Sequence, residues 1–202
     1  IAEGASISRS MSEDGSPTAF ALTLNASDVD AGTTLTWSIA TPASNGTASV
    51  SGTGTTKTIG YVPNADYNGS DSFVVQVSDG SLTDTITVNV TIDPVNDAPV
   101  IAEGATISRS MSEDSSPTAF ALTLNASDVD AGTTLTWSIA TPASNGTASV
   151  SGTGISKSVG YVPNADYNGS DQFVVRVSDG SLDDTITINV SIDPVNDAPV
   201  CT

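Results

Sequence analysis

The stretch Thr-Ile-Thr-Val-Asn-Val-Thr-Ile at residues 85–92 decides the fold class of this chain. Its apolar residues Ile86, Val88, Val90 and Ile92 alternate strictly with polar ones. Successive side chains of a β-strand point to opposite faces, so this run predicts a strand with one face in a core. The same alternation occurs at residues 20–24, 35–39, 59–61 and 73–77, and weaker alternation at 5–10 and 47–51. No window has helical spacing, and the sequence therefore predicts an all-β fold.

The same run returns one hundred positions later, because residues 1–100 and 101–200 align without a gap. The differences are few and mild, such as Ile59 against Val159 and Val88 against Ile188. A period of about 100 residues is too long for a solenoid unit and suits a domain that folds alone. We therefore expect two tandem antiparallel β-sandwiches of immunoglobulin-like type with about seven strands each. The expected bounds are 1–99, 100–199 and a tail at 200–202.

Turn residues separate the predicted strands. Asn-Gly dipeptides at 45–46 and 68–69 predict hairpins, because both central residues of the tight hairpin turn need a positive φ. Gly15-Ser16-Pro17 and Asp79-Gly80 mark further turns. Trp37 lies on the third predicted strand as core filling, and no cysteine pair brackets it, which disfavours an antibody-type domain.

Composition excludes several functions. The chain has 23 acids, 5 bases and no histidine, for a net charge of −18. Nucleic acid is not an expected partner, because its phosphates require basic side chains. No apolar run is long enough to insert into a membrane. We expect no enzyme, since histidine, an internal cysteine and a phosphate-binding loop are all missing from the sequence. The lone Cys201 is interpreted as the start of a truncated segment, with a thiol that dimerises chains as the alternative.

The acids gather where predicted strands end rather than at strand centres. For any single aspartate, capping of a turn is the simpler explanation. Several carboxylates about 4 Å apart would, however, repel by roughly 4 kcal/mol per pair at an effective dielectric of 20. A bound cation relieves this repulsion at neutral pH. Oxygen-only ligands favour Ca²⁺ over Mg²⁺, and the absence of histidine disfavours zinc and copper.

In order along the chain, these motifs resemble those of cadherin repeats, most closely the cadherin-like repeats of large bacterial surface adhesins of the RTX type. Asp93-Pro-Val-Asn-Asp-Ala-Pro99 is similar to the family's calcium-binding linker, and Asp28-Val-Asp30 to its paired-aspartate loop. Val77-Ser-Asp-Gly80 resembles the single-aspartate loop, and Glu13-Asp14 the acidic pair near the first strand. We call residues 93–100 and their copy 193–200 the closing octets.

The resemblance implies Ca²⁺ at the junction of the repeats, with the linkers at 93–99 and 193–199. The implied junction ligands are Glu13, Asp66, Asp93, Asn96, Asp97, Asp128, Asp130 and Asp179. Asp71 is an alternative to Asp66, and the number of ions stays open. The implied outer half-sites are Asp28, Asp30 and Asp79 at one end, and Glu113, Asp166, Asp193, Asn196 and Asp197 at the other.

These expectations lead to a calcium-rigidified extender or adhesion module of a large bacterial cell-surface adhesin, located outside the cell. Its partners would be neighbouring repeats of the same chain. The alternative is a calcium-dependent module that binds carbohydrate or like repeats on another cell. Sugar sites usually present exposed aromatic rings, and only Tyr67 and Tyr167 fall in predicted loops.

Overall fold

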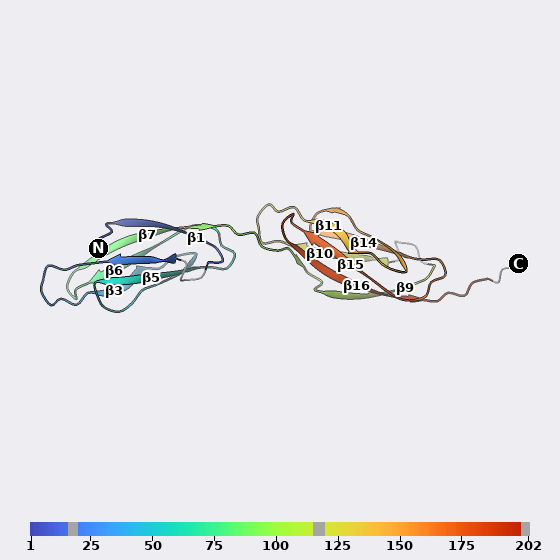
Figure 1. Cartoon of the computed structure of the whole chain (residues 1–202), viewed down its shortest axis with the longest axis horizontal. Helices are drawn as coiled ribbons and strands as arrows, with labels where there is room; N and C mark the ends of the chain where they lie inside the picture. Colours follow the sequence, from blue (N-terminus) through green and yellow to red (C-terminus); the bar gives the residue numbers. More distant parts are fainter. Residues whose placement is uncertain (16–19, 115–119, 199–202) are drawn as a thin grey trace. The chain divides into compact units, whose positions relative to one another are not determined.

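The structure is a computed structural model that describes residues 1–15, 20–114 and 120–198. The chain forms two compact units, Ile1–Val95 (unit 1) and Asn96–Thr202 (unit 2), and each is an all-β sandwich (Figure 1). The predicted fold class is therefore confirmed. The described residues include no helix of the length and apolarity that crossing a membrane would require. Ser16, Pro17 and Cys201, which carried sequence-based interpretations, lie outside the described residues.

Unit 1 packs two sheets face to face. Its strands are β1 (Ser6–Ser12), β2 (Leu22–Asn25), β3 (Thr36–Thr41), β4 (Gly46–Ser49), β5 (Thr56–Pro63), β6 (Gly69–Ser78) and β7 (Thr83–Asp93). One sheet has the order β1-β7-β6-β3 and the other β2-β5-β4. All pairings are antiparallel except that of β1 with β7, which is parallel and runs from Ser6↔Thr87 to Ser12↔Asp93.

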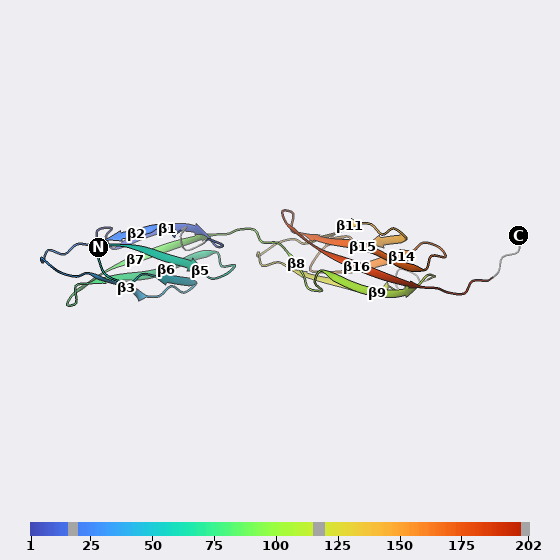
Figure 2. The same ribbon diagram turned by 60° about the horizontal axis from the view of Figure 1, so that its bottom comes forward.

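Unit 2 repeats this plan with two additional short strands (Figure 2). Its strands are β8 (Val100–Ile101), β9 (Thr106–Ser112), β10 (Leu122–Ser127), β11 (Thr136–Thr141), β12 (Gly146–Ser149), β13 (Gly152–Thr153), β14 (Ser156–Pro163), β15 (Gly169–Ser178) and β16 (Asp183–Asp193). The sheets have the orders β13-β11-β15-β16-β9 and β12-β14-β10-β8. The short strand β8 pairs with the end of β10, so the chain just ahead of β9 becomes part of the second sheet.

The core of each unit follows the alternation in the sequence. Ile86, Val88, Val90 and Ile92 of β7 are all buried, whereas Asn89 between them is exposed. Trp37 is buried as predicted, and its indole N–H donates to the Gly54 carbonyl oxygen at 2.7 Å. Burial of an indole is tolerated when its N–H has such a partner.

The two Asn-Gly hairpin predictions are wrong. β3 pairs with β6 and β4 pairs with β5, so the chain crosses from one sheet to the other at Asn45-Gly46. Gly46 is required by close packing rather than by a positive φ, because a Cβ there would lie 2.4 Å from the Tyr61 hydroxyl oxygen. Asn68-Gly69 likewise lies where the chain passes from β5 in one sheet to β6 in the other. A hairpin forms instead at Asp79-Gly80, between the antiparallel strands β6 and β7.

A buried carboxylate fixes the crossing between the sheets. Asp71 Oδ2 accepts hydrogen bonds from the Tyr61 hydroxyl at 2.7 Å and the Asn45 backbone N–H at 2.9 Å. Its Oδ1 accepts from the backbone N–H groups of Ser44 and Ser72. Asp171 makes the same bonds in unit 2. Both Asp71 oxygens therefore serve the fold, which argues against its alternative role as a cation ligand.

We expect Asp171→Asn to lower the free energy of unfolding of unit 2 by about 1.5–3 kcal/mol, because hydrogen bonds to a charged group are lost and an amide donor faces other donors. Thermal unfolding followed by methyl NMR signals of unit 2 measures this. The control is Asp183→Thr, which introduces at an exposed position the residue that unit 1 carries there. Equal stability of the two variants would show that the Asp171 network contributes nothing.

The same network predicts a pH dependence. Burial opposes ionisation of Asp71 and Asp171, but the tyrosine hydroxyl and the backbone donors outweigh it and lower the pKa of both groups. Their contribution to stability is therefore fully present above the pKa of an unfolded aspartate, about 3.9, and is lost as pH falls through the lower folded-state pKa. In urea unfolding, the stability difference between the wild type and Asp171→Asn should shrink as pH falls below about 3.9, the pKa of an unfolded aspartate. A difference that stays constant as the pH is lowered from neutral to well below that value contradicts the assignment.

Candidate metal centre

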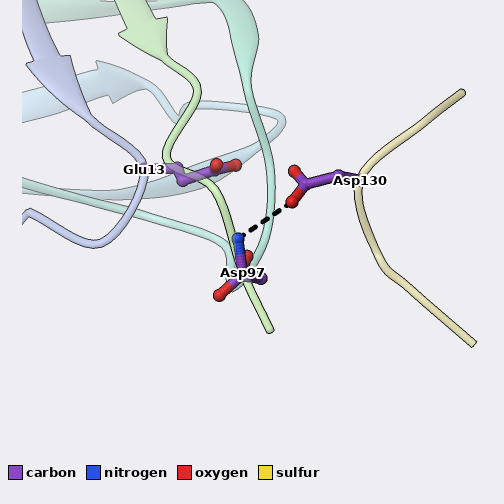
Figure 3. Close-up of side chains that lie close together, drawn as sticks. All are labelled: Glu13, Asp97 and Asp130. Atoms are coloured by element: carbon purple, nitrogen blue, oxygen red, sulfur yellow. Dashed lines mark hydrogen bonds between the residues drawn. The ribbon is translucent and has the colours of Figure 1, made fainter. Parts of the chain in front are cut away.

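Five of the predicted ligands lie together in unit 2, in the segment before its first strand and in two of its loops. Asp128 and Asp130 occupy the loop after β10, Asp179 follows β15, and Asn96 and Asp97 precede β8. The Asp97 backbone N–H donates to Asp130 Oδ2 at 2.9 Å, drawn as a dashed line in Figure 3. The Asn96 side-chain amide donates to Asp179 Oδ2 at 2.7 Å. We call these five residues the unit 2 acidic loops.

One oxygen in this group is buried without compensation. Asp128 Oδ1 accepts the backbone N–H of Asp130 at 2.9 Å, but Asp128 Oδ2 is buried and has no hydrogen-bond partner among the residues that the structure describes. A carboxylate oxygen in that situation is costly unless a positive charge or donor compensates it. Carboxylate oxygens of Asp97 and Asp130 also lie within 4.8 Å of each other. This set of oxygen donors fits a hard cation such as Ca²⁺.

Asp179 is ionised at neutral pH. The backbone N–H of Ser181, the Asn96 amide and the backbone N–H of Leu182 lower the pKa of its carboxyl group. Its Oδ1 accepts from Ser181 and Leu182 at 2.5 and 2.7 Å, while Oδ2 is engaged by Asn96. Asp179 and Asp130 therefore hold their negative charge against the Asn96 amide and the Asp97 backbone N–H, which are neutral donors.

The remaining junction residues belong to unit 1. Glu13 is only 4% exposed; its Oε1 accepts the Val95 backbone N–H at 2.6 Å and its Oε2 accepts the Asn68 amide at 3.2 Å. Asp93 is the exposed last residue of β7, and its carbonyl oxygen accepts the Glu13 N–H. Asp66 lies in the loop between β5 and β6 with a φ of 56°. Each unit thus anchors its own part of the first closing octet.

The end of unit 2 shows the same arrangement around the second closing octet. Glu113 is buried and accepts the Val195 N–H at 2.6 Å, while Asp114, Asp166 and Asp197 offer exposed carboxylate oxygens within 4.8 Å of one another. The charge of Asp114, then loss of solvation, and then Asp166 and Glu113 raise the pKa of Asp197. The predicted residues Asp193 and Asn196 are exposed. Asp114 was missing from the predicted set, although its position in the acidic pair Glu113-Asp114 was a usable signal.

The corresponding loops of unit 1 bind their own backbone. Asp28 Oδ1 accepts the Asp30 N–H at 2.8 Å, and Asp79 Oδ1 accepts the N–H groups of Ser81 and Leu82 at 2.6 Å each. The latter two bonds lower the pKa of Asp79. Asp28 and Asp30 are exposed, in contrast to the half-buried Asp128 and Asp130. Turn capping therefore accounts for part of what these aspartates do.

Sequence reasoning also missed Asp84 and Asp184. Asp184 Oδ2 accepts the Ile101 backbone N–H at 2.8 Å, and Asp84 bonds the backbone nitrogen of Ile1, which is the corresponding position of unit 1. Asp84 in β7 and Asp184 in β16 thus each connect the first residues of their unit to its last long strand. Its recurrence at the same position of both repeats was a signal that could have identified it.

Comparison with known proteins identifies the family of the chain. A family model described as the bacterial Ig domain matches residues 1–91 and again residues 96–191. No curated protein sequence matches. Among solved structures, EC1-2 of human protocadherin-24 aligns at 17% identity over 96% of this chain and 97% of that one, with a TM-score of 0.53. EC1-3 of protocadherin gamma C5 aligns at 18% identity over 92% of this chain and 65% of that one, with a TM-score of 0.57. These likenesses concern the fold alone.

An endo-fucoidan hydrolase of glycoside hydrolase family 107 also aligns, at 19% identity and a TM-score of 0.40. The chain spans only 28% of that hydrolase, and so weak a likeness carries no inference about activity. From the two family matches, the chain belongs to the bacterial Ig domain family, as two tandem β-sandwiches that are structurally similar to cadherin domains.

Proposed function

We propose that the chain is a calcium-rigidified extender or adhesion segment of a large bacterial cell-surface adhesin of the RTX type, with Ca²⁺ bound at the first closing octet. The observation that carries this proposal is the buried Asp128 Oδ2, for which the described part of the chain supplies no hydrogen-bond partner, beside a linker already held by Asp130 and Asp179. Turn capping accounts for the hydrogen bond of Asp128 Oδ1 but not for the burial of Oδ2. A bound cation would supply the positive charge that compensates this burial.

The ligands would come from both units. Unit 2 would supply Asn96, Asp97, Asp128, Asp130 and Asp179, and unit 1 would supply Glu13, Asp66 and Asp93. When bound, Ca²⁺ would supply the positive charge that offsets the mutual repulsion of these carboxylates. The residues themselves hold the linker, because Glu13 binds the Val95 N–H and Asp130 binds the Asp97 N–H.

The linker is suited to a stiff connection. Val95 is bonded to unit 1 and the next residue, Asn96, is bonded to unit 2, so no unbonded stretch of chain separates the two anchors. Pro94 and Pro99 restrict the backbone on either side, because their rings fix φ. Shared cations at this point would remove most of the remaining freedom between the units.

Near-identity of the repeats supports a spacer rather than a specific recognition surface, because copies of a spacer need no individual specificity. Extracellular calcium modules have dissociation constants of about 10⁻⁴–10⁻³ M and are substantially filled at millimolar calcium. Bacterial Ig-like domains are usually found on surface or secreted proteins, which supports an extracellular location and neighbouring repeats as partners.

The alternative, calcium-dependent binding of carbohydrate or of like repeats on another cell, has weaker support. Tyr67 and Tyr167 are half-buried against the cores, and each hydroxyl donates to a backbone carbonyl, of Ser70 and Ser170 respectively, at 2.9 Å. Rings held in this way offer little flat, exposed surface to a sugar. A glycan array probed in calcium should therefore show no binding, and reproducible binding of one glycan class would favour the alternative.

The chain offers a matched pair of variants for the calcium proposal. Asp128→Ala with Asp130→Ala should weaken the tightest Ca²⁺ binding seen by calorimetry about tenfold or more, which corresponds to about 1.4 kcal/mol or more. Asp28→Ala with Asp30→Ala removes the same loop residues from unit 1, where they are not among the proposed ligands at the first closing octet, and should leave that tightest binding unchanged.

Two results would contradict the calcium proposal. One is a wild-type chain that shows no Ca²⁺ binding at millimolar concentration. The other is an equal loss of affinity in both double variants, which would show that the tightest site is not specific to the first closing octet.

A further inference from the structure

Each unit contains two Asn-Gly dipeptides, Asn45-Gly46 and Asn68-Gly69 in unit 1 and their copies at 145–146 and 168–169 in unit 2. An asparagine that precedes glycine can lose its side-chain amide without an enzyme, because no Cβ shields the glycine nitrogen. That nitrogen attacks the asparagine Cγ atom, a five-membered succinimide ring closes, and ammonia leaves. Water then opens the ring and gives aspartate or isoaspartate. The net reaction consumes a water molecule, releases ammonia and replaces a neutral amide by a carboxylate.

Contacts oppose this reaction at Asn45-Gly46. Asn45 is half-buried, its backbone N–H donates to Asp71 Oδ2 at 2.9 Å, and its carbonyl oxygen accepts a backbone N–H at 2.8 Å. Gly46 is packed closely against Tyr61. The attack requires the asparagine to rotate toward the next backbone nitrogen, and all of these contacts resist that rotation. The copy at 145–146 makes the same contacts.

Asn68-Gly69 lies in a more open setting. Both residues are exposed, Asn68 at the end of the loop after β5 and Gly69 at the start of β6. Gly69 has a φ of 127°, and a Cβ there would lie 3.3 Å from the Tyr67 hydroxyl oxygen, so the fold requires glycine at this position. The Asn68 amide donates to Glu13 Oε2 at 3.2 Å, which is long for such a bond and restrains the side chain weakly.

The bond from Asn68 gives the modification a structural consequence. Glu13 is buried, and its other oxygen, Oε1, accepts the Val95 backbone N–H at 2.6 Å. Loss of the amide would place a negative oxygen where Glu13 now receives a donor. Two carboxylates in contact repel, and they repel more strongly where water is excluded. Glu13 would be displaced, and its bond to Val95 in the first closing octet would weaken.

The arrangement is the same in unit 2. Gly169 has a φ of 131°, the Asn168 amide donates to Glu113 Oε2 at 3.3 Å, and Glu113 Oε1 accepts the Val195 N–H at 2.6 Å. We infer that Asn68 and Asn168 are sites of spontaneous deamidation, which turns the amide that binds a buried glutamate into a carboxylate and loosens that glutamate's bond to the closing octet. The reaction needs only water and no metal ion, so it goes beyond the proposed cation site and does not rest on it.

The first test ages the whole chain in chelator, at neutral and at mildly alkaline pH, and locates deamidation by peptide mapping with mass spectrometry. We expect Asn68 and Asn168 to react about tenfold faster than Asn45 and Asn145, because a hydrogen bond that must first be broken slows a rate by about that factor. Alkaline pH should speed the reaction, since the attacking nitrogen must lose its proton. Asn68→Gln should suppress it at that position alone, because glutamine would have to close a less favourable six-membered ring.

A synthetic peptide with the sequence of residues 64–72 is the positive control for the conditions. Equal rates at all four dipeptides would overturn the inference. So would intact Asn68 and Asn168 in a chain that has been aged until the peptide has fully reacted.

The second test measures what the new carboxylate does, with Asn68→Asp standing for the aged chain, again in chelator. Hydrogen exchange of the Val95 amide, followed by NMR, should become about tenfold faster, because the bond to Glu13 is lost. The matched control is Asn64→Asp, which adds the same charge at an exposed position of the same loop and should leave the Val95 rate unchanged. An unchanged rate in Asn68→Asp, or an equal rise in both variants, contradicts the inferred loosening. Because both tests are made without calcium, their outcome is independent of the calcium proposal.

Discussion

Carboxylates that accept the backbone N–H groups of the linker are the interactions on which the ends of both units depend. Glu13 accepts from Val95 and Asp130 accepts from Asp97, so the chain between the units is held from both directions by negative oxygens. Neutral N–H donors offset only part of that charge. In each unit the linker is therefore held by a carboxylate whose negative charge is only partly offset, and the proposed cation site follows from this imbalance.

The acidic residues divide into two kinds by where their oxygens point. Asp71 and Asp184 use theirs to fix the fold, the first by accepting from the Tyr61 hydroxyl and the second by accepting from the Ile101 backbone N–H. In the unit 2 acidic loops, one oxygen of Asp128 is buried and receives no hydrogen bond from residues 1–15, 20–114 or 120–198. The acidic residues behind the net charge of −18 therefore do more than keep the surface soluble. Different carboxylates accept hydrogen bonds in the turns, at the edge of the core and at the linker.

Much of the fold could be predicted from the sequence, because alternation reports directly on which face of a strand is buried. Ile86, Val88, Val90 and Ile92 illustrate this. The hairpins at Asn45-Gly46 and Asn68-Gly69 could not be predicted, because a local turn signal cannot distinguish a hairpin from a passage between sheets. Gly46 is required by Tyr61, which lies 15 positions away and contacts it only in three dimensions. The role of Asp71 depends on the same crossing. The linker motif indicated the acidic loops, whereas the pairing of Asn96 with Asp179 needed coordinates.

The central claim is that shared cations at residues 93–97 lock the connection between the two units. Residual dipolar couplings of the backbone amides, measured for each unit in calcium and in chelator, test it most directly. The account predicts one common alignment tensor for both units in calcium and two tensors of different magnitude in chelator. Independent alignment of the units in saturating calcium, or a common tensor that persists after the metal is removed, would contradict it.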